Sequence, residues 1–408
     1  MTKQNEKDAK RVPELRFKGF TDDWEQRKLG EIAEEVKGNS GSINNIPILT
    51  ISAANGWMNQ KDRFSQIIAG NELKKYTLLK KGELSYNHGN SKLAKYGTVF
   101  VQDSHDQALV PRVYHSFKMV AQNNPYFIEY LFASGLPNKE LSKIVTSGAR
   151  MDGLLNINKK EFFSIKLNNP SSEEQSKIAK LFQSLDKTIT LHEEKQRQLE
   201  QLKKALLQKM FADKTGYPAL RFKGFTEKWE QEKLGNIIRQ SSLKNNNYNY
   251  PILTSAHEGL VPQSTHFGSQ QRHDTSDYNV IKPNQITYRN RSDDGRFTFN
   301  INKLNVTGLV SKFYPVFSFQ NTDNDFMVNN LNHNPEIKYD LDVLSVGTGQ
   351  HVLSFTNLKK YEILAPSYVE QKRIGKLLLQ LDKTITLHDK KIQYLKQLKR
   401  GLLQKMFV

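Results

Sequence analysis

The residues of this sequence that could do chemistry form only incomplete sites. Asn123-Asn124-Pro125-Tyr126 approaches the Asn-Pro-Pro-Tyr element of amino-methyltransferases, but its second position is wrong, and we interpret it as the start of a helix. Gly347-Thr348-Gly349 lacks the third Gly of a dinucleotide or S-adenosylmethionine fold. Glu35-Val36-Lys37 has the Glu-x-Lys end of a metal-dependent nuclease site without a convincing upstream Asp, and is expected in a charged turn. The sequence contains no GxxxxGK[ST] phosphate loop, so an ATP-driven motor is not expected.

Cysteine and histidine add no catalytic set. The sequence has no Cys, which excludes disulfides, thiol nucleophiles and Cys-ligated metal sites. None of the ten His residues forms an i, i+4 pair, and no carboxylate pair or Ser-His-Asp set can be defended. His192 and His388 lie in helical segments, where they are expected at a polar register position or a partner contact. The residue types therefore favour binding over catalysis, and no metal or cofactor is expected in this chain.

The composition describes a globular, basic protein. Its 408 residues, 37% of them hydrophobic, are enough for two or three domains. The 60 Lys and Arg residues exceed the 42 Asp and Glu residues, and the net charge of +18 makes a polyanion the first partner to consider. No apolar run is long enough to span a membrane and no apolar signal-type segment begins the sequence, so a cytoplasmic location is expected.

The sequence contains an internal repeat of about half its length. LRFKGFTDDWEQRKLG at Leu15–Gly30 returns as LRFKGFTEKWEQEKLG at Leu220–Gly235, LDKTITLH at Leu185–His192 returns at Leu381–His388, and LLQKMF at Leu206–Phe211 returns at Leu402–Phe407. The separation between matching stretches shortens steadily along the chain, as expected for one fold with short deletions in its second copy. The ends of the two copies are nearly identical, which suggests that both bind the same kind of partner. The middles of the two copies diverge, which suggests that they contact different things. Duplication followed by drift remains the alternative.

The divergent middles have the pattern of a mixed α/β fold. Residues 50–120 alternate short apolar runs with Gly, Asn and Lys turns, and a short helix is predicted at Pro125–Phe132. The second middle repeats that order. We predict two α+β domains in a pseudo-two-fold repeat, separated by long helices. The predicted regions are a first reading domain at 1–172, a central helical region at 173–212, a second reading domain at 213–368 and a C-terminal helical region at 369–408.

Polar turns at the same repeat position are the predicted DNA contacts. Arg pairs bidentately with guanine, Asn and Gln pair with adenine, and carboxylates accept from cytosine. The candidates in the first turn are Tyr86, Asn87, His88, Asn90 and Lys92, and those in the second are Tyr288, Arg289, Asn290, Arg291 and Arg296. Segments just before the helical regions supply second-choice contacts, namely Arg150, Gln350 and His351. The alternative for each residue is an exposed polar hairpin without a ligand.

The repeated helical segments carry apolar seams. Residues 173–211 lack Gly and Pro, Ser171 or Ser172 could cap the helix, and Asp186 could break it or cap it again. The seams read Ile189, Leu199, Leu202, Leu206 and Met210 in the first copy, and Ile385, Ile392, Leu395, Leu398, Leu402 and Met406 in the second. Two such seams can satisfy each other as a pair of antiparallel helices.

The length of this helix suggests a spacing for the two domains. At 1.5 Å per residue, Asp186–Phe211 would extend roughly 39 Å. Two-fold DNA-binding proteins address half-sites roughly 34 to 36 Å apart. The sequence therefore predicts a bipartite target with an unread spacer between its halves.

The repeated segments resemble the specificity (S) subunit of type I restriction-modification enzymes. The resemblance rests on the duplicated Leu15–Gly30 stretch, on EEQSKIAKLFQSLDKTI and VEQKRIGKLLLQLDKTI, and on LKKALLQKMF and LKRGLLQKMF. It covers essentially the whole chain. It implies two target recognition domains that each read one part of a split DNA sequence, separated by an antiparallel coiled coil. The seam residues Leu199, Leu202, Leu206, Met210, Leu395, Leu398, Leu402 and Met406 resemble the region of inter-helix and methyltransferase-subunit contact in that family.

The resemblance also implies partners and their cofactors. Two methyltransferase (M) subunits would dock on the helices and methylate adenine with S-adenosylmethionine. Restriction (R) subunits would bring ATP- and Mg-dependent translocation and cleavage. Other classes of function stay open: a free-standing bipartite DNA-binding regulator, a nuclease or methyltransferase with an unrecognised site, and a coiled-coil scaffold. Methyl transfer by the purified chain alone would identify an enzyme, and a scaffold would not bind DNA.

Overall fold

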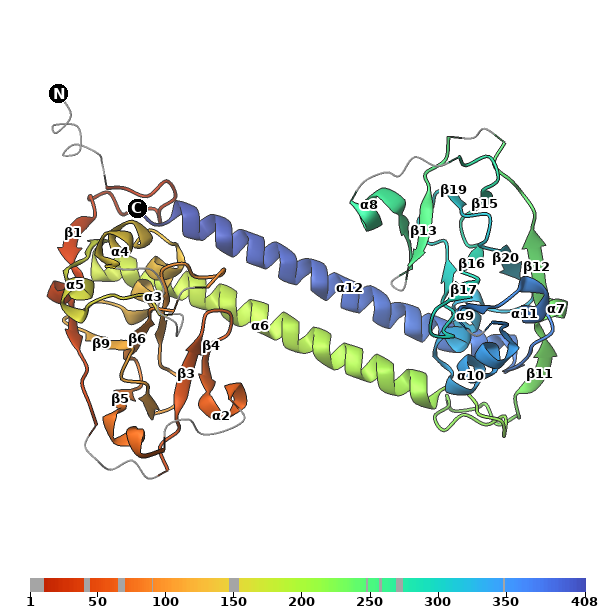
Figure 1. Cartoon of the computed structure of the whole chain (residues 1–408), viewed down its shortest axis with the longest axis horizontal. Helices are drawn as coiled ribbons and strands as arrows, with labels where there is room; N and C mark the ends of the chain where they lie inside the picture. The colour runs from red at the N-terminus through yellow and green to blue at the C-terminus, as the bar shows by residue number, and fades with distance from the viewer. Residues whose placement is uncertain are drawn as a thin grey trace. The chain divides into compact units, whose positions relative to one another are not determined.

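The chain folds into two compact units that share two long helices. The computed structural model describes residues 11–39, 45–64, 70–89, 91–146, 154–246, 249–256, 259–268, 274–347 and 349–408 (Figure 1). Unit 1 comprises Met1–His192 with Lys391–Val408, and unit 2 comprises Glu193–Lys390. Helices α6 (Ser172–Lys209) and α12 (Tyr368–Lys405) therefore each contribute to both units. The sequence-based division instead placed each long helix in a region of its own.

Unit 1 is built on a four-stranded antiparallel sheet with the strand order β2-β9-β6-β7. Three two-stranded pairs, β1–β10, β3–β4 and β5–β8, surround it. The elements before α6 are β1 (Glu25–Lys28), α1 (Leu29–Ile32), β2 (Ala33–Glu35), β3 (Leu49–Ser52), β4 (Gly56–Asn59), α2 (Gln60–Arg63), the 3₁₀ helix η1 (Gly70–Lys75), β5 (Thr77–Lys80), β6 (Leu84–Asn87), β7 (Thr98–Val101), β8 (Gln107–Val110), β9 (His115–Met119), α3 (Pro125–Ala133), α4 (Asn138–Ile144), α5 (Lys159–Ser164) and β10 (Lys166–Asn169).

Unit 2 repeats this topology. Its four-stranded sheet has the order β12-β20-β16-β18, and its two-stranded pairs are β11–β22, β13–β14, β15–β19 and β17–β21. The elements between the long helices are β11 (Glu230–Lys233), α7 (Leu234–Ile237), β12 (Ile238–Ser241), β13 (Leu253–Ala256), β14 (Gly259–Pro262), α8 (Gln263–Phe267), β15 (Asn279–Ile281), β16 (Ile286–Tyr288), β17 (Arg291–Ser292), β18 (Phe299–Ile301), β19 (Gly308–Val310), β20 (Val316–Phe319), α9 (Asn324–His333), α10 (Pro335–Leu344), β21 (His351–Val352), α11 (Phe355–Leu358) and β22 (Glu362–Ala365). The predicted repeat of two mixed α/β domains is confirmed.

Helix α3 begins where the sequence predicted a helix start, and helix α9 begins in a similar way in unit 2. Asn124 caps α3, since its side-chain oxygen accepts hydrogen bonds from the backbone N–H groups of Tyr126 and Phe127. Asp323 caps α9 in the same way through Phe326. These caps satisfy amide groups that a helix start leaves unpaired. The Asn-Asn-Pro-Tyr sequence is therefore a helix start.

A repeated tryptophan lies at the centre of each core. Trp24 packs edge-on against Phe127 with ring centroids 5.7 Å apart, and Trp229 packs against Phe326 at 5.5 Å. Phe407, which follows α12, completes the core of unit 1 beside Trp24. The residues that follow α6 complete the core of unit 2 in the same manner.

This packing corrects the predicted role of two seam residues. Met210 and Met406 were expected to contact the other helix or an M subunit. They are instead buried in the cores of unit 2 and unit 1, respectively. The reason is that α6 ends at Lys209 and α12 ends at Lys405, so the chain turns into the domain before either methionine.

An arginine–glutamate ion pair holds the start of each long helix to its domain. The guanidinium of Arg16 donates to both carboxylate oxygens of Glu174 at 2.7 and 2.8 Å, and Arg221 donates to Glu370 at 2.7 Å through two nitrogens. Both carboxylates are at most 1% exposed. Bidentate, charge-assisted bonds of this kind fix geometry as well as charge.

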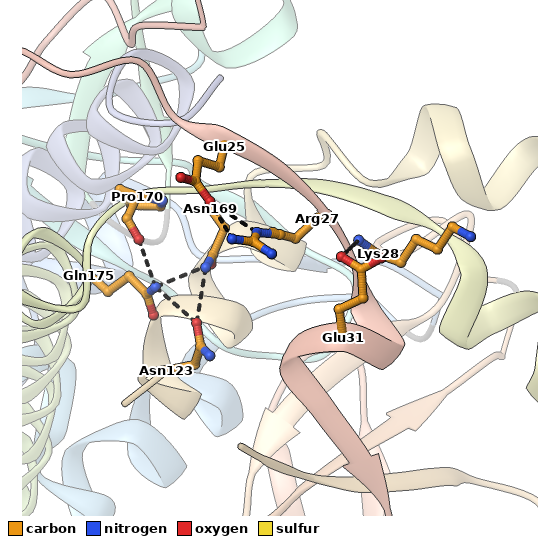
Figure 2. A network of polar contacts seen from close by, with 8 residues as sticks. All are labelled: Glu25, Arg27, Lys28, Glu31, Asn123, Asn169, Pro170 and Gln175. Carbon is orange, nitrogen blue, oxygen red and sulfur yellow. Dashed lines mark hydrogen bonds and ion pairs between the residues drawn. The ribbon is translucent and has the colours of Figure 1, made fainter. Parts of the chain in front are cut away.

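A buried glutamine follows each of these carboxylates. The Gln175 amide donates to the side chains of Asn123 and Asn169 and to the carbonyl of Pro170, at 2.9 to 3.2 Å. Figure 2 shows these residues around Gln175. Its counterpart Gln371 donates to the carbonyl of Pro366 at 2.8 Å. The near-identical sequence at these two places therefore holds each helix to its domain.

In unit 1 the two long helices run antiparallel. Ile189 of α6 packs with Ile392 and Leu395 of α12. Lys399 forms an ion pair of 2.5 Å with Asp186, so residue numbers rise along one helix as they fall along the other. Unit 2 contains the matching pair, in which Lys203 lies 2.5 Å from Asp382. Helix α6 continues through Asp186 without a break, because that side chain accepts from Lys399 and Tyr130 and does not cap the backbone.

Candidate nucleic-acid interface

The structure of unit 2 brings together two segments that the sequence analysis selected separately. The turn after β16 contains Arg289 and Asn290, and Arg291 begins the short strand β17. Strand β17 pairs with β21, which contains His351. The amide of Gln350 also donates to Asp293 at 3.4 Å. The primary and second-choice contact segments are therefore neighbours on one surface.

A polar cleft of about 460 Å³ lies at this place. Its lining residues are Ser255, Ala256, Arg289, Arg291, Ser292, Asp293, Asp294, Arg296 and Thr298. The three arginines are exposed. Asp294 accepts hydrogen bonds from the Ser292 hydroxyl and from the backbone N–H of Arg296, and these bonds lower its pKa. The cleft thus offers both fixed acceptors and cationic donors.

In the corresponding turn of unit 1, the Asn87 side chain forms hydrogen bonds within the protein. The side chain of Asn87 accepts from the N–H of Gly89 at 3.1 Å and donates to the carbonyl of Ile51 at 3.2 Å. Gly89 forms a β-bridge with Leu154, which matches the pairing of Arg291 with Val352 in unit 2. The fold of the contact segments is therefore repeated even where the residues differ.

Three predicted base-contacting residues are core residues instead. Tyr86 and Tyr288 have no exposed surface, and their hydroxyls donate to the carbonyls of Tyr96 and Leu353. Burial raises the pKa of both phenols. His88 is 6% exposed, and its ring nitrogens lie 2.6 and 2.8 Å from the carbonyl oxygens of Leu155 and Val113. The prediction of a base contact is wrong for these side chains because they face inward.

The alternation of the strands would have identified the two tyrosines. Tyr86 follows the buried Leu84 by two residues, and Tyr288 follows the buried Ile286 by two residues. Residues two apart on a strand point to the same face. Each tyrosine therefore continues the inward face of the central strand.

The remaining predicted contacts differ in their environment. Lys92 is exposed, and Asn290 is half-buried with its backbone carbonyl accepting from the N–H of Leu353. His351 lies with Nδ1 2.7 Å from a carboxylate oxygen of Asp342. The predicted contacts Asn90 and Arg150 lie outside the described residues.

A pair of turns that sequence reasoning missed adjoins these segments. Arg112-Val113 precedes β9 and Lys312-Phe313 precedes β20, so that a basic residue and an exposed apolar residue occupy the same place in both units. Val113 is 46% exposed and Phe313 is 49% exposed. The signal was available in the matching stretches ALVPRVYHSF and GLVSKFYPVF, in which the two middles keep a basic and apolar pair.

The turn of unit 1 borders a basic cleft of about 350 Å³. Its lining residues are Glu35, Lys37, Gly38, Lys75, Thr77, Arg112, Val113 and Lys159. Glu35 lies 2.9 Å from Lys159 and 3.1 Å from Lys37. Burial acts to raise the pKa of Glu35, but the hydrogen bonds from the two lysines prevail and lower it. Glu35-Val36-Lys37 is thus part of an ion-pair cluster within a cationic surface.

The long helices leave apolar side chains uncovered within each unit. Leu191 in unit 1 and Leu387 in unit 2 occupy the same position of the repeated LDKTITLH motif, and both are 67% exposed. Leu202 and Leu398 are 47% and 38% exposed. The other seam residues are more covered: Leu395 packs between the helices, Leu206 and Leu402 pack against the domain cores, and Leu199 is half-buried. Leu191 and Leu387 were not among the predicted seam residues, although the repeated LDKTITLH motif contains them.

The described part of the chain contains no group of three or more His, Cys, Asp or Glu side chains arranged to hold a metal ion. Among the same residues, no helix is both long and apolar enough to cross a membrane. The structure thus has a duplicated scaffold, and each of its two units contains a polar cleft lined by basic residues.

Comparison with known sequences identifies the family. The profile described as "Type I restriction modification DNA specificity domain" matches twice, at residues 21–201 and 204–397. The chain belongs to this family and is a DNA-recognition subunit of the type I restriction-modification class, in which this subunit is not itself the catalyst.

Similar proteins have the same extent. The putative type I restriction enzyme MjaX specificity subunit of Methanocaldococcus jannaschii is 22% identical, over 94% of this chain and 92% of that protein. The S subunit of a type I system from M. genitalium has a similar fold, with a TM-score of 0.59, 14% identity, and coverage of 97% of this chain and 99% of that one. The HsdS subunit from Thermoanaerobacter tengcongensis gives a TM-score of 0.44 at 14% identity, over 94% and 96% of the two chains.

Proposed function

We propose that each unit reads one part of a bipartite double-stranded DNA target. The observation that supports this proposal most strongly is the repeated surface: one contact turn, one paired segment and one basic-apolar turn occur at the same place in both units, with different residues. Lysine and arginine side chains supply salt-dependent attraction to phosphates, and the side chains that differ between the units supply discrimination between bases.

The exposed members of the two surfaces are the proposed contacts. In unit 2 they are Arg289, Arg291, Arg296 and Lys312, with the half-buried Gln350 beside them, and in unit 1 they are Lys92 and Arg112. Asn87, Asn90, Asn290, Arg150 and His351 remain proposed contacts of lower priority. The side chains of Asn87 and His351 bond within the protein, and Asn290 is half-buried. Asn90 and Arg150 lie outside the described residues. Arginine and amide side chains on these turns have the hydrogen-bonding groups that direct readout uses.

The helices are proposed to bind the partner subunits. Exposed leucines at matching positions of α6 and α12 would each contact one methyltransferase (M) subunit, so that two M subunits bind one chain. S-adenosylmethionine, and the ATP and Mg used by restriction (R) subunits, would be held by those partners. The complex would methylate adenine in the cytoplasm. The helices would also set the length of the unread spacer.

Methyl transfer assayed with purified components tests this assignment. The chain, its M partner and S-adenosylmethionine are incubated with plasmid DNA, and incorporated methyl groups are mapped. We expect methylation only when both proteins are present, at sites with two specified parts. Methyl transfer by the chain alone would contradict the proposal, and specific DNA binding without any effect on methylation would favour a free-standing regulator.

The spacer role has a separate test. Four residues, about one helical turn, are inserted into both α6 and α12 between the ion pairs of the two units. We expect both half-sites to stay unchanged and the spacer between them to lengthen. An insertion that altered the half-sites themselves would contradict the role of the helices as spacers.

A further inference from the structure

An exposed aromatic ring orients one arginine of the unit 2 cleft. The guanidinium carbon of Arg291 lies 5.1 Å from the ring centroid of Phe313, and the ammonium of Lys312 lies 5.7 Å from it. The ring is 49% exposed. Cation–π contacts at exposed sites contribute little to folding stability, but they restrict where the guanidinium can point.

The fold does not require this arrangement. In unit 1, Gly89 occupies the position of Arg291, as shown by the equivalent β-bridges to Leu154 and Val352. Val113 occupies the position of Phe313 in the equivalent turn. Unit 1 forms the same backbone pairing with neither the arginine nor the ring. The Arg291–Phe313 pair therefore serves something particular to unit 2.

The surroundings of Arg291 match the edge of one kind of base pair. Arg291 lines the cleft together with the carboxylates of Asp293 and Asp294. In the major groove, guanine presents the acceptors O6 and N7, which an arginine binds bidentately, and cytosine presents an amino donor that a carboxylate accepts. An arginine already held against a ring loses less conformational freedom when it forms such a fork.

We propose that Arg291 reads a guanine in the half-site of unit 2, with Phe313 as the positioning residue that aims it. This inference rests on the proposed bipartite DNA recognition and adds the base that is read. It also predicts an asymmetric target, because unit 1 has no arginine at the corresponding position.

The first test is selection from a pool of random double-stranded DNA by the complex of the full chain with its M partner. For Arg291→Ala we expect the preference for guanine at one position of one half-site to fall about 10- to 100-fold, with the other half-site unchanged. Arg291→Lys keeps the charge but lacks the planar fork, so it should not restore the preference. Phe313→Leu keeps an apolar side chain and should lower the preference at the same position by a smaller factor.

A matched control is Arg239→Ala, which removes an exposed arginine from the edge strand β12, outside the cleft. This variant should select the same DNA sequence as the wild-type protein. A second test replaces the selected guanine by 7-deazaguanine, which lacks the N7 acceptor. We expect weaker binding by the wild-type complex and no further loss for Arg291→Ala.

Two results would overturn the inference. One is an Arg291→Ala variant that selects the same sequence as Arg239→Ala. The other is an Arg291→Ala variant that binds all DNA sequences more weakly by the same factor, with binding restored in Arg291→Lys. That result would indicate a phosphate contact. A wild-type complex that selects no two-part sequence would instead refute the proposed function itself, and the assignment of guanine would fail with it.

Discussion

The two units keep the same internal bonds and place different side chains on the same surface turns. Arg16–Glu174 and Arg221–Glu370 are the same buried ion pair, made twice with nearly equal distances. On the contact surface, by contrast, Gly89 stands where Arg291 does, and Val113 stands where Phe313 does. Comparing the units therefore separates residues that hold the scaffold from residues that are free to change with the target.

The largest expected effect tests the shared part of this comparison. Glu174→Ala and Glu370→Ala each leave an arginine unpaired beside the core, and removing one partner of a buried pair costs about 3 to 5 kcal/mol. We expect both variants to lower the free energy of unfolding by similar amounts in urea denaturation. The exposed pair Glu25–Arg27 is the control, and Glu25→Ala should change stability by less than about 1 kcal/mol.

Unequal losses for the two buried pairs would show that the units do not use the repeated anchor equally. If only one variant lost stability, the start of the helix in the unaffected unit would be held mainly by its glutamine, Gln175 or Gln371, rather than by its ion pair.

A half-buried acid beside the core of unit 1 distinguishes it from unit 2. Glu129 of α3 is held in unit 1 at the position that Val328 occupies in α9 of unit 2. Burial raises the pKa of Glu129 from 4.5 to about 7, and its carboxylate accepts from the N–H of Val101. The folded state thus favours the protonated form, so the stability associated with this group is complete below pH 4.5 and is lost as the pH rises through 7.

Glu129→Gln should remove this dependence and keep the acceptor. The stability of the wild type relative to the variant should fall by about 3 kcal/mol between pH 4.5 and pH 8, as measured by denaturation at each pH. Val328→Thr, a polar change at the matching position of unit 2, should introduce no comparable slope. A difference between wild type and Glu129→Gln that is flat with pH would contradict a raised pKa for this carboxyl group.

The smallest expected effect concerns the partner surface. Leu191→Ser and Leu387→Ser change side chains that are two-thirds exposed, so neither should alter stability by more than about 0.5 kcal/mol. If each leucine is buried by an M subunit, each substitution should weaken M binding by about 1 to 2 kcal/mol in titration calorimetry. Similar losses are expected at both positions because the motif is repeated, and unchanged M binding in both variants would exclude this surface.

The sequence was sufficient for the fold and for the family, and less so for individual contacts. Repetition of Leu15–Gly30 and Leu185–His192 predicted two similar domains and antiparallel helices, because long repeats constrain topology without requiring knowledge of any single contact. Tyr86, Tyr288 and His88 were assigned to the surface because a polar turn was treated as one exposed block. The alternation of apolar and polar residues in Leu84-Ser85-Tyr86 and Ile286-Thr287-Tyr288 already contradicted this for the two tyrosines.

Other features depend on contacts that sequence spacing does not reveal. The entry of Met210 and Met406 into domain cores follows from where each helix ends and from the packing of the next aromatic residue. The Arg291–Phe313 pair joins residues from two turns that are separated along the chain by strands β18 and β19. Only the folded arrangement shows that the Arg291 guanidinium lies against the Phe313 ring.

The most direct test of independent reading by the two units is long-read detection of methylated bases in cells that express the chain with its M partner. The wild type should give one motif with two specified parts and an unread spacer. Arg289→Ala, which removes an exposed side chain from the unit 2 cleft, should change only one of the two parts. A single uninterrupted motif, or a change in both parts of the motif, would contradict the account.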